Sequence, residues 1–185
     1  MEKLIIIDHQ LLQIIIERLC RQIIEKHDSF KHAVILGMQP RGVFLAQRIH
    51  KRLEDLLQKE IPFGYLDTTF YRDDFRRKDI QLKANETKVP FAIEGKNVIL
   101  VDDVLYTGRT VRAAMDAMIA FGRPQTVDLA VLIDRKYSRD LPIQANYVGK
   151  GVNCLTSEKV LVELTEQEGI TQDNIWLISK KVISE

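Results

Sequence analysis

Apolar residues recur along the chain with two different periods, which predict helices and strands in alternation. The clearest helical spacing begins after Asp8, a suitable N-cap, and continues to about Lys26. Its buried stripe would consist of Leu12, Ile15, Ile16, Leu19 and Ile23. Residues 97–101 instead form a continuous apolar run, which is typical of a central parallel strand covered on both faces.

The remaining elements are shorter and follow the same alternation. Helices are also predicted over residues 42–58 and 110–121, the second ended by Gly122 with Pro124 beyond it. Further strands are predicted over residues 5–7 (a strand or an arm), 33–36, 62–70, 127–133, 147–148, 159–164 and 175–178. This alternation indicates an α/β fold with a mostly parallel sheet, which binds ligands at the carboxyl ends of its strands. We assign the last two strands to the sheet and its edge, away from the active site.

The length and composition are those of one ordinary globular domain spanning residues 1–185. The chain is 45% hydrophobic and 29% charged, and its net charge of +1 creates no strong field toward nucleic acid or membrane. The sequence has no signal peptide or membrane-spanning run, and Cys20 and Cys154 form no paired motif. These features predict a cytoplasmic protein. Residues 71–88 are rich in charge with little apolar periodicity, so we expect a mobile excursion there.

Two adjacent carboxylates, Asp102 and Asp103, follow the apolar run at residues 97–101. Burying such a pair is unfavourable unless a ligand uses it, and neighbouring ribose hydroxyls are suitable partners. The residues that lead on into the predicted helix are Val104, Leu105, Tyr106, Thr107, Gly108, Arg109 and Thr110. Backbone N–H groups at a helix start form an anion site, the glycine allows a phosphate to approach closely, and the threonine hydroxyls add donors.

This pattern differs from the Walker loop and from the dinucleotide fingerprint, because neither G-x-x-x-x-G-K-[ST] nor G-x-G-x-x-G occurs here. An ordinary capped turn would explain Thr-Gly-Arg-Thr alone about as well as a phosphate site. The whole order runs from hydrophobic strand through Asp-Asp to Thr-Gly-x-Thr and helix. It resembles the phosphoribosyl pyrophosphate (PRPP) motif of type I phosphoribosyltransferases.

Other segments extend the resemblance over nearly the whole chain and narrow it to the PyrR family. They include Leu36-Gly37-Met38-Gln39-Pro40-Arg41-Gly42, Thr69-Phe70-Tyr71-Arg72-Asp73-Asp74, Leu141-Pro142-Ile143 and Tyr147-Val148-Gly149-Lys150. The resemblance implies the type I phosphoribosyltransferase fold, a single domain with a small hood and a mobile lid loop. It also implies a uracil phosphoribosyltransferase of pyrimidine salvage, which makes UMP and pyrophosphate from uracil and PRPP, and which forms dimers or higher homo-oligomers.

The resemblance assigns pyrophosphate binding to two segments. Gln39, Pro40, Arg41 and Gly42 would form the pyrophosphate loop, although a proline has no N–H to donate. Arg72 would act from the lid as a catalytic residue, reaching the pyrophosphate as the lid closes. Without the resemblance, these segments would be a surface turn and a solvated charge run.

The base and the metal complete the implied site. Asp134, Arg135 and Val148 would lie at the uracil pocket. Asp102 and Asp103 would be catalytic and would hold Mg²⁺ through PRPP and water, since this cation favours phosphate oxygens over a full protein cage. Carboxylates near the ribose would also stabilise the positive charge that develops on the ring in the transition state.

Two alternative functions stay open. Some PyrR-family members are UMP-responsive RNA-binding attenuators of pyrimidine genes, and their first helix carries Thr-Arg and then His. This chain has Glu17, Arg18 and Arg21 there, and Gln144 replaces an arginine, so Glu17, Arg21 and Gln144 weaken the case for RNA. The implied RNA positions that stay basic are Arg18, Arg139 and Lys150. The second alternative is a type I transferase for hypoxanthine, guanine or orotate.

Overall fold

The computed structural model describes residues 2–28, 30–71, 85–155 and 157–179. Most of the predicted excursion at residues 71–88 lies outside these ranges, and so does Arg72. At the end of that segment, Lys88 forms an antiparallel bridge with Tyr65.

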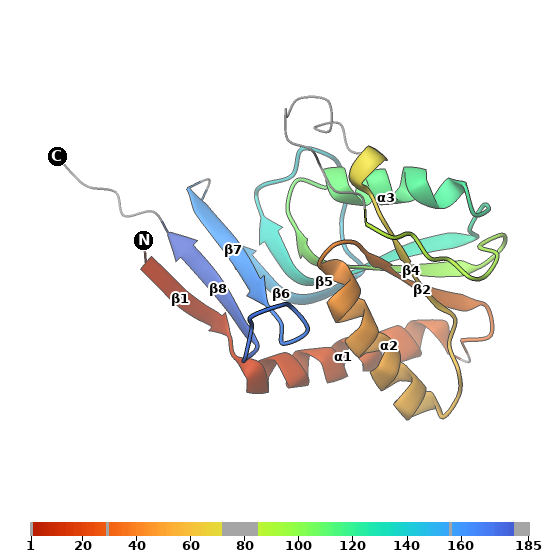
Figure 1. The fold of residues 1–185 in the computed structure, drawn as a ribbon, viewed down its shortest axis with the longest axis horizontal. Helices are drawn as coiled ribbons and strands as arrows, with labels where there is room; N and C mark the ends of the chain where they lie inside the picture. Colours follow the sequence, from red (N-terminus) through yellow and green to blue (C-terminus); the bar gives the residue numbers. More distant parts are fainter. Residues whose placement is uncertain (1, 29, 72–84, 156, 180–185) are drawn as a thin grey trace.

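A five-stranded parallel sheet forms the centre of the molecule, in the order β3–β2–β4–β5–β6 (Figure 1). Its strands are β2 (Ala33–Met38), β3 (Phe63–Leu66), β4 (Asn97–Leu105), β5 (Thr126–Lys136) and β6 (Tyr147–Asn153). Residues 98–103 of the middle strand β4 are all buried, as a strand covered on both faces requires. The predicted α/β fold with a mostly parallel sheet is confirmed.

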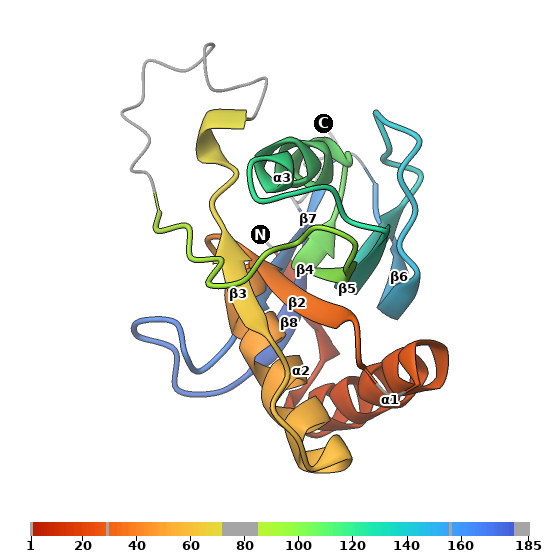
Figure 2. The ribbon, with the colours of Figure 1, turned by 90° about the vertical axis from the view of Figure 1, so that its right-hand side faces the viewer.

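Helices cover both faces of this sheet (Figure 2). α1 (His9–His27) and α2 (Gly42–Leu57) lie on one face, and α3 (Arg109–Ile119) lies on the other. The predicted stripe of α1 is buried, and the side chain of Asp8 caps the helix by accepting a hydrogen bond of 2.8 Å from the N–H of Leu11. Of the helices that the structure describes, not one combines the length and apolar character needed to cross a bilayer.

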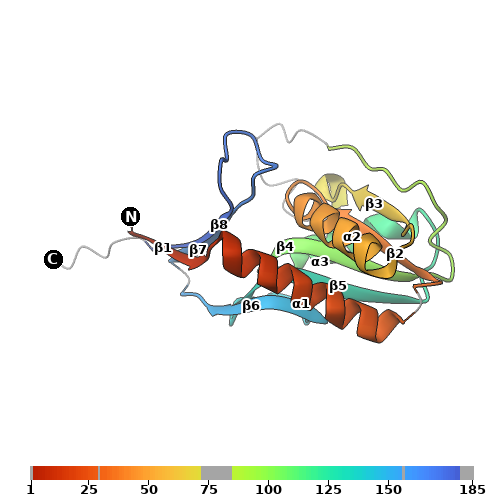
Figure 3. The same ribbon diagram turned by 90° about the horizontal axis from the view of Figure 1, so that it is seen from below.

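A second, antiparallel sheet lies beyond the ends of the central strands (Figure 3). It consists of β1 (Glu2–Ile7), β8 (Asn174–Ser179) and β7 (Glu158–Glu163), in the order β1–β8–β7. The assignment of residues 159–164 and 175–178 to the central sheet is therefore wrong. The connection from β6 to β7, residues 154–157, is too short for a parallel crossover, which needs about a dozen residues. This sheet is the small hood that the family resemblance implies.

The hood and the central sheet share one apolar core. Ile7 of β1, Val162 of β7 and Ile175 of β8 belong to the same buried cluster as Ile133 of β5. This continuity supports the expected single domain, because separate domains would each bury their own core.

Several strand boundaries differ from the predicted ones, and two of these differences have a clear local cause. β4 continues to Leu105, past the apolar run, because β5 extends beside it and Leu105 pairs with Asp134. β3 ends at Leu66 instead of continuing to residue 70. The carboxylate of Asp67 accepts hydrogen bonds from the N–H of Thr69 at 3.0 Å and from its hydroxyl at 2.6 Å, which favours a turn over a strand. A short 3₁₀ turn over Thr69–Tyr71 follows.

Candidate active site

The carboxylate pair lies inside the carboxyl end of β4. Asp102 is 8% exposed and Asp103 is 9% exposed. The N–H of Asp103 donates to the Asp102 carboxylate at 2.9 Å, and the N–H of Val104 donates to the Asp103 carboxylate at 2.8 Å. Burial raises the pKa of Asp103, and the positive charge of Arg41 acts in the opposite direction. Backbone N–H groups thus hold both carboxylates in place, and Arg41 partly offsets the cost of burying the charge of Asp103.

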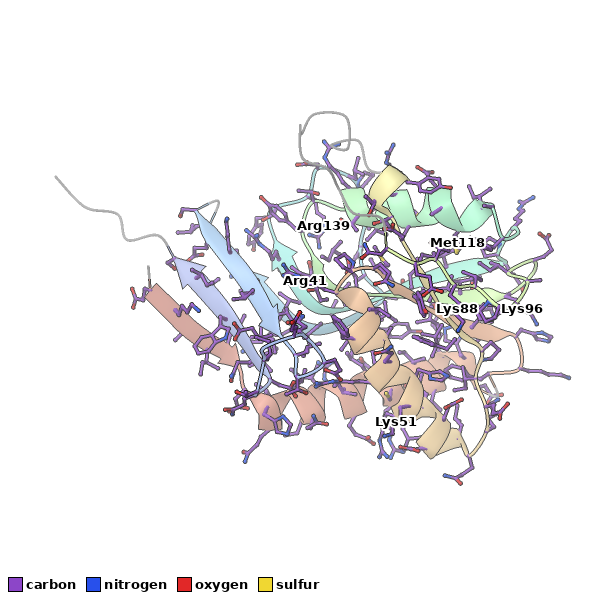
Figure 4. The ribbon with its side chains drawn as sticks, in the orientation of Figure 1. Arg41, Lys51, Lys88, Lys96, Met118 and Arg139 are labelled. Carbon is purple, nitrogen blue, oxygen red and sulfur yellow. The ribbon has the colours of Figure 1, made fainter. Side chains whose placement is uncertain are left out.

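A cavity of about 350 Å³, here called the Asp102 cavity, opens over this pair. It brings the predicted pyrophosphate residues Gln39, Pro40 and Arg41 together with Asp102 and Asp103. Arg41 lies at the end of the central sheet that faces the hood, and Lys96 lies at the opposite end (Figure 4). Two segments far apart in sequence therefore form one polar site at the carboxyl ends of parallel strands.

Gly42 allows these segments to come this close. A Cβ at this position would lie 2.7 Å from the carbonyl oxygen of Val101 and 2.8 Å from Asp102 Oδ1. Such contacts are far inside van der Waals distance, so the first turn of α2 can rest against β4 only with glycine here. The N-terminus of α2 then faces the site with its positive dipole end.

The loop between β4 and α3 forms a second cavity of about 230 Å³, here called the loop cavity, which adjoins the first. Gly108 adopts a φ of +90°, which favours glycine, and precedes the first residue of α3. In the part of the chain that the structure describes, the N–H groups of Tyr106, Thr107 and Gly108 donate to no protein acceptor. Thr107 and Thr110 also line this cavity. Free backbone donors at a helix start form an anion site.

Comparisons with known proteins agree with this geometry. A family model described as a phosphoribosyl transferase domain matches residues 5–166. A relative from Enterococcus faecalis, named bifunctional protein pyrR, is 44% identical over 169 residues, covering 91% of this chain and 94% of its own. Another, named bifunctional protein PyrR, from Listeria monocytogenes, is 44% identical over 182 residues, covering 97% and 98%. The chain belongs to the PyrR family of phosphoribosyltransferases.

Solved structures support the fold of this PyrR-family chain. A hypoxanthine-guanine phosphoribosyltransferase from Bacillus anthracis superposes with a TM-score of 0.68 at 18% identity, covering 94% of this chain and 98% of its own. A hypoxanthine phosphoribosyltransferase from Trypanosoma cruzi gives a TM-score of 0.70 at 16% identity, covering 95% and 97%. At such low identity the likeness shows the fold alone, which is that of the type I phosphoribosyltransferases.

The predicted base-binding residues of this PyrR-family chain lie in different surroundings. Arg135 is 7% exposed and lines the Asp102 cavity, where its guanidinium stacks 4.0 Å from the ring centre of Tyr106. The carboxylate of Asp134 pairs with Arg139. The carbonyl of Val148 accepts a hydrogen bond of 3.2 Å from Arg18. Val148 lines neither the Asp102 cavity nor the loop cavity.

Sequence reasoning missed two residues of the site, Val111 in the loop cavity and Val160 in the Asp102 cavity. Val160, on β7, lines the Asp102 cavity, although we placed the C-terminal strands away from the active site. That expectation is wrong because the hood folds back over the ends of the central strands. No local signal marks Val160, since an apolar residue in a short strand has the same pattern wherever the strand packs.

A metal would have to share its coordination with substrate. Among the described residues, no group of three or more His, Cys, Asp or Glu side chains is placed to hold an ion. The carboxylates of Asp102 and Asp103 line the Asp102 cavity. Two hard oxygen donors beside an anion site fit Mg²⁺, which usually takes one or two carboxylates and completes its shell with phosphate and water.

The PyrR-family chain also contains a larger cavity, of about 590 Å³, between α1, α2 and the connection from β7 to β8. We call it the α1–α2 cavity. Arg48 donates to Glu166 at 2.6 Å and to Asp173 at 2.8 Å, and Arg52 donates to Glu17 at 2.6 Å. Both arginines that line this space are thus paired with carboxylates that line it too.

Proposed function

We propose that this chain is a uracil phosphoribosyltransferase, which makes UMP and pyrophosphate from uracil and PRPP. One observation carries the proposal: the buried pair Asp102 and Asp103 adjoins both a loop of free backbone donors and the exposed Arg41. PRPP has a ribose between a 5′-phosphate and a pyrophosphate. The order of groups in the site matches that order along the ligand.

The carboxylates suit the ribose. Asp102 and Asp103 would accept hydrogen bonds from neighbouring ribose hydroxyls. When the base nitrogen displaces pyrophosphate from the anomeric carbon, positive charge develops on the ring, as in glycoside hydrolysis. Fixed carboxylates in a buried site stabilise that charge without having to reorganise.

The two anionic ends of PRPP would be bound by different devices. The 5′-phosphate would bind in the loop cavity, where the N–H groups of residues 106–108 and the N-terminus of α3 converge. The pyrophosphate would meet Arg41 and the start of α2 in the Asp102 cavity. Arg72, which lies outside the described residues, stays our proposed lid contact to pyrophosphate.

Magnesium fits the same arrangement. Asp102 and Asp103 would hold Mg²⁺ through PRPP and water, and the bound ion would neutralise charge on the departing pyrophosphate. The protein's own part is to fix the ribose and both anionic ends so that the anomeric carbon faces the base.

We place the base beside Arg135, at the edge of the Asp102 cavity. Arg135 lines the Asp102 cavity and lies over the ring of Tyr106, so it would lie beside the base. Asp134 and Val148 would act mainly through their backbone, which suits uracil because its edge offers one N–H and two carbonyls. A purine is larger than uracil and would need more space beside the Arg135–Tyr106 pair.

An assay of each base tests this function. The protein is incubated with PRPP, Mg²⁺ and either uracil, hypoxanthine, guanine or orotate, and nucleotide formation is followed. We expect UMP from uracil and much slower reactions with the other bases. Turnover of another base without UMP formation would contradict the proposal and favour the second alternative.

RNA binding is the weaker proposal, because the expected cations have partners inside the chain. Glu17 pairs with Arg21 at 2.8 Å and with Arg52 at 2.6 Å. Arg18 donates to the carbonyl of Gly149 at 2.5 Å, and the amine of Lys150 donates to the carbonyl of Ile6 at 2.9 Å. A gel shift against the leader of the pyrimidine operon, with UMP added, tests this function. Tight, salt-sensitive and leader-specific binding would restore it.

A further inference from the structure

Arg139 connects three separate parts of the chain around the phosphate loop. It donates to the carbonyl of Leu105 at 3.3 Å and also to the carbonyl of Tyr106. It donates further to the carbonyls of Arg135 at 3.0 Å and Ile143 at 3.1 Å. Its remaining nitrogen pairs with the carboxylate of Asp134. A side chain with this many internal acceptors is fixed in one conformation and is not directed to solvent.

The residues after Arg139 hold the same loop through their backbone. We call residues 139–143 the brace. The N–H groups of Asp140 and Leu141 both donate to the carbonyl of Thr107, at 3.0 and 3.2 Å. The space above Gly108 is filled by Ile143, 3.2 Å from where a Cβ would stand. The brace therefore takes up three consecutive carbonyls of the loop, at residues 105, 106 and 107.

Because the peptide group is planar, holding these carbonyls also fixes the direction of the N–H groups that form the anion site. In a planar trans peptide the C=O of one residue points opposite to the N–H of the next. Carbonyls held toward the brace at residues 105, 106 and 107 thus direct the N–H groups of 106, 107 and 108 away from it. These are the donors that have no protein acceptor in the described chain, and all three residues line the loop cavity.

We propose that Arg139 is a positioning residue, which orients the backbone donors of the loop toward the 5′-phosphate of a phosphoribosyl ligand. The inference deepens the proposed function and rests on it for the identity of that ligand. Arg139 does not touch the phosphate. It acts through the carbonyls of Leu105 and Tyr106 and keeps the loop in its binding conformation before the ligand arrives. Figure 4 shows Arg139 at the same end of the sheet as Arg41, the arginine proposed to meet the pyrophosphate.

The guanidinium is required for its shape as well as its charge. Its planar fork offers five N–H donors in fixed directions, whereas a lysine amine is a single flexible point charge. The carboxylate of Asp134 accepts from one terminal nitrogen of the fork, while the other terminal nitrogen donates to the loop carbonyls. A lysine would keep the ion pair with Asp134 but would lose most of the carbonyl contacts.

The test compares Arg139→Gln and Arg139→Lys with Arg123→Gln, which removes an exposed arginine away from both cavities. Binding of PRPP with Mg²⁺, and of ribose 5-phosphate alone, is measured by calorimetry, and the KM for PRPP and for uracil is measured separately. We expect both Arg139 variants to bind the two phosphates about 10- to 100-fold more weakly, with a matching rise in the KM for PRPP and little change in the KM for uracil. Arg123→Gln should behave as the wild type.

Three outcomes would overturn the inference. Phosphate binding at the wild-type level in Arg139→Gln would do so, including when its Tm is lowered, because the role would then be structural only. Full rescue by lysine would show that charge, and not the orientation of carbonyls, is what matters. Equal weakening of uracil binding would indicate general damage to the site. If Arg139→Gln fails to fold, Arg139→Lys and Asp134→Asn carry the same comparison.

The failure of the proposed function looks different. A wild-type protein that binds PRPP and ribose 5-phosphate but makes no UMP would refute uracil transfer and leave the Arg139 comparison standing. A wild-type protein that makes UMP, with Arg139 variants that bind phosphate normally, would refute the inference alone.

Discussion

The loop cavity and the α1–α2 cavity are both polar, but their polar groups are used in opposite ways. In the α1–α2 cavity, which has the larger volume, Arg48 is paired with Glu166 and Asp173. In the loop cavity, the carbonyls of residues 105–107 are taken up by the brace, while the adjoining N–H groups have no protein acceptor among the described residues. Size and charge therefore do not single out the binding site that we propose. Donors that the fold orients and leaves unsatisfied do, because they gain most from an anion.

The largest expected effect is on kcat, and it should occur at the carboxylates of the Asp102 cavity but not at a carboxylate of the α1–α2 cavity. Asp102→Asn and Asp103→Asn should each lower kcat for UMP formation by about 100-fold or more, since an amide no longer stabilises positive charge on the ribose. The matched control is Asp55→Asn, the same chemical change in the lining of the α1–α2 cavity, which should retain wild-type activity. Wild-type rates in both site variants would show that the ribose lies elsewhere.

The reverse comparison concerns stability. Asp173 is almost completely buried, so Asp173→Asn leaves Arg48 without its buried partner. We expect the free energy of unfolding to fall by about 3 kcal/mol, the scale for breaking a buried ion pair. PRPP affinity should not change. Urea unfolding measures the first quantity and calorimetry the second. Loss of PRPP affinity in this variant would mean that the α1–α2 cavity is coupled to the site.

The same carboxylate should make the fold sensitive to acid. Burial alone would raise the pKa of Asp173, but hydrogen bonds from Arg48, the N–H of Thr165 and His9 together hold its pKa well below its usual range. A lowered folded pKa contributes stability that is present above the unfolded value of about 3.9 and is lost as pH falls below it. Unfolding measured from about pH 6 downward should therefore show a smaller acid loss in Asp173→Asn than in the wild type.

Local sequence patterns account for much of the fold and for the parts of the site that lie close together in sequence. The stripe of α1, the buried run of β4 and the glycine at 108 each depend on neighbours within a few residues. Two strands of the hood were wrongly assigned to the central sheet, because the sequence of a short strand does not reveal which sheet it joins. The place of Val160 and the inward direction of Arg139 depend on packing between distant segments, so an isolated valine or arginine carries no sign of them.

A smaller effect is expected at the loop itself. Thr107→Val removes a hydroxyl that lines the loop cavity and should weaken PRPP binding by about 1–3 kcal/mol, the scale for one hydrogen bond to a charged group. Thr165→Val removes a hydroxyl from the α1–α2 cavity, where it accepts from Arg48 at 3.0 Å, and should leave PRPP binding unchanged. Equal affinities in the two variants would mean that the backbone donors alone hold the phosphate.

The smallest effect is expected on the surface of α1, where charges are paired but exposed. Glu17→Gln removes the partner of Arg21 and Arg52, and exposed pairs of this kind contribute little to stability. Glu25→Gln is the control, since it removes the same charge from an exposed position of the same helix.

If Glu17 keeps both arginines from binding phosphates, its variant alone should bind single-stranded RNA more tightly, with a salt dependence steeper by about one to two phosphate contacts. Equal RNA binding in the two variants would show that pairing with Glu17 does not limit these arginines. The surface of α1 would then resemble the α1–α2 cavity, with charges that serve the fold alone.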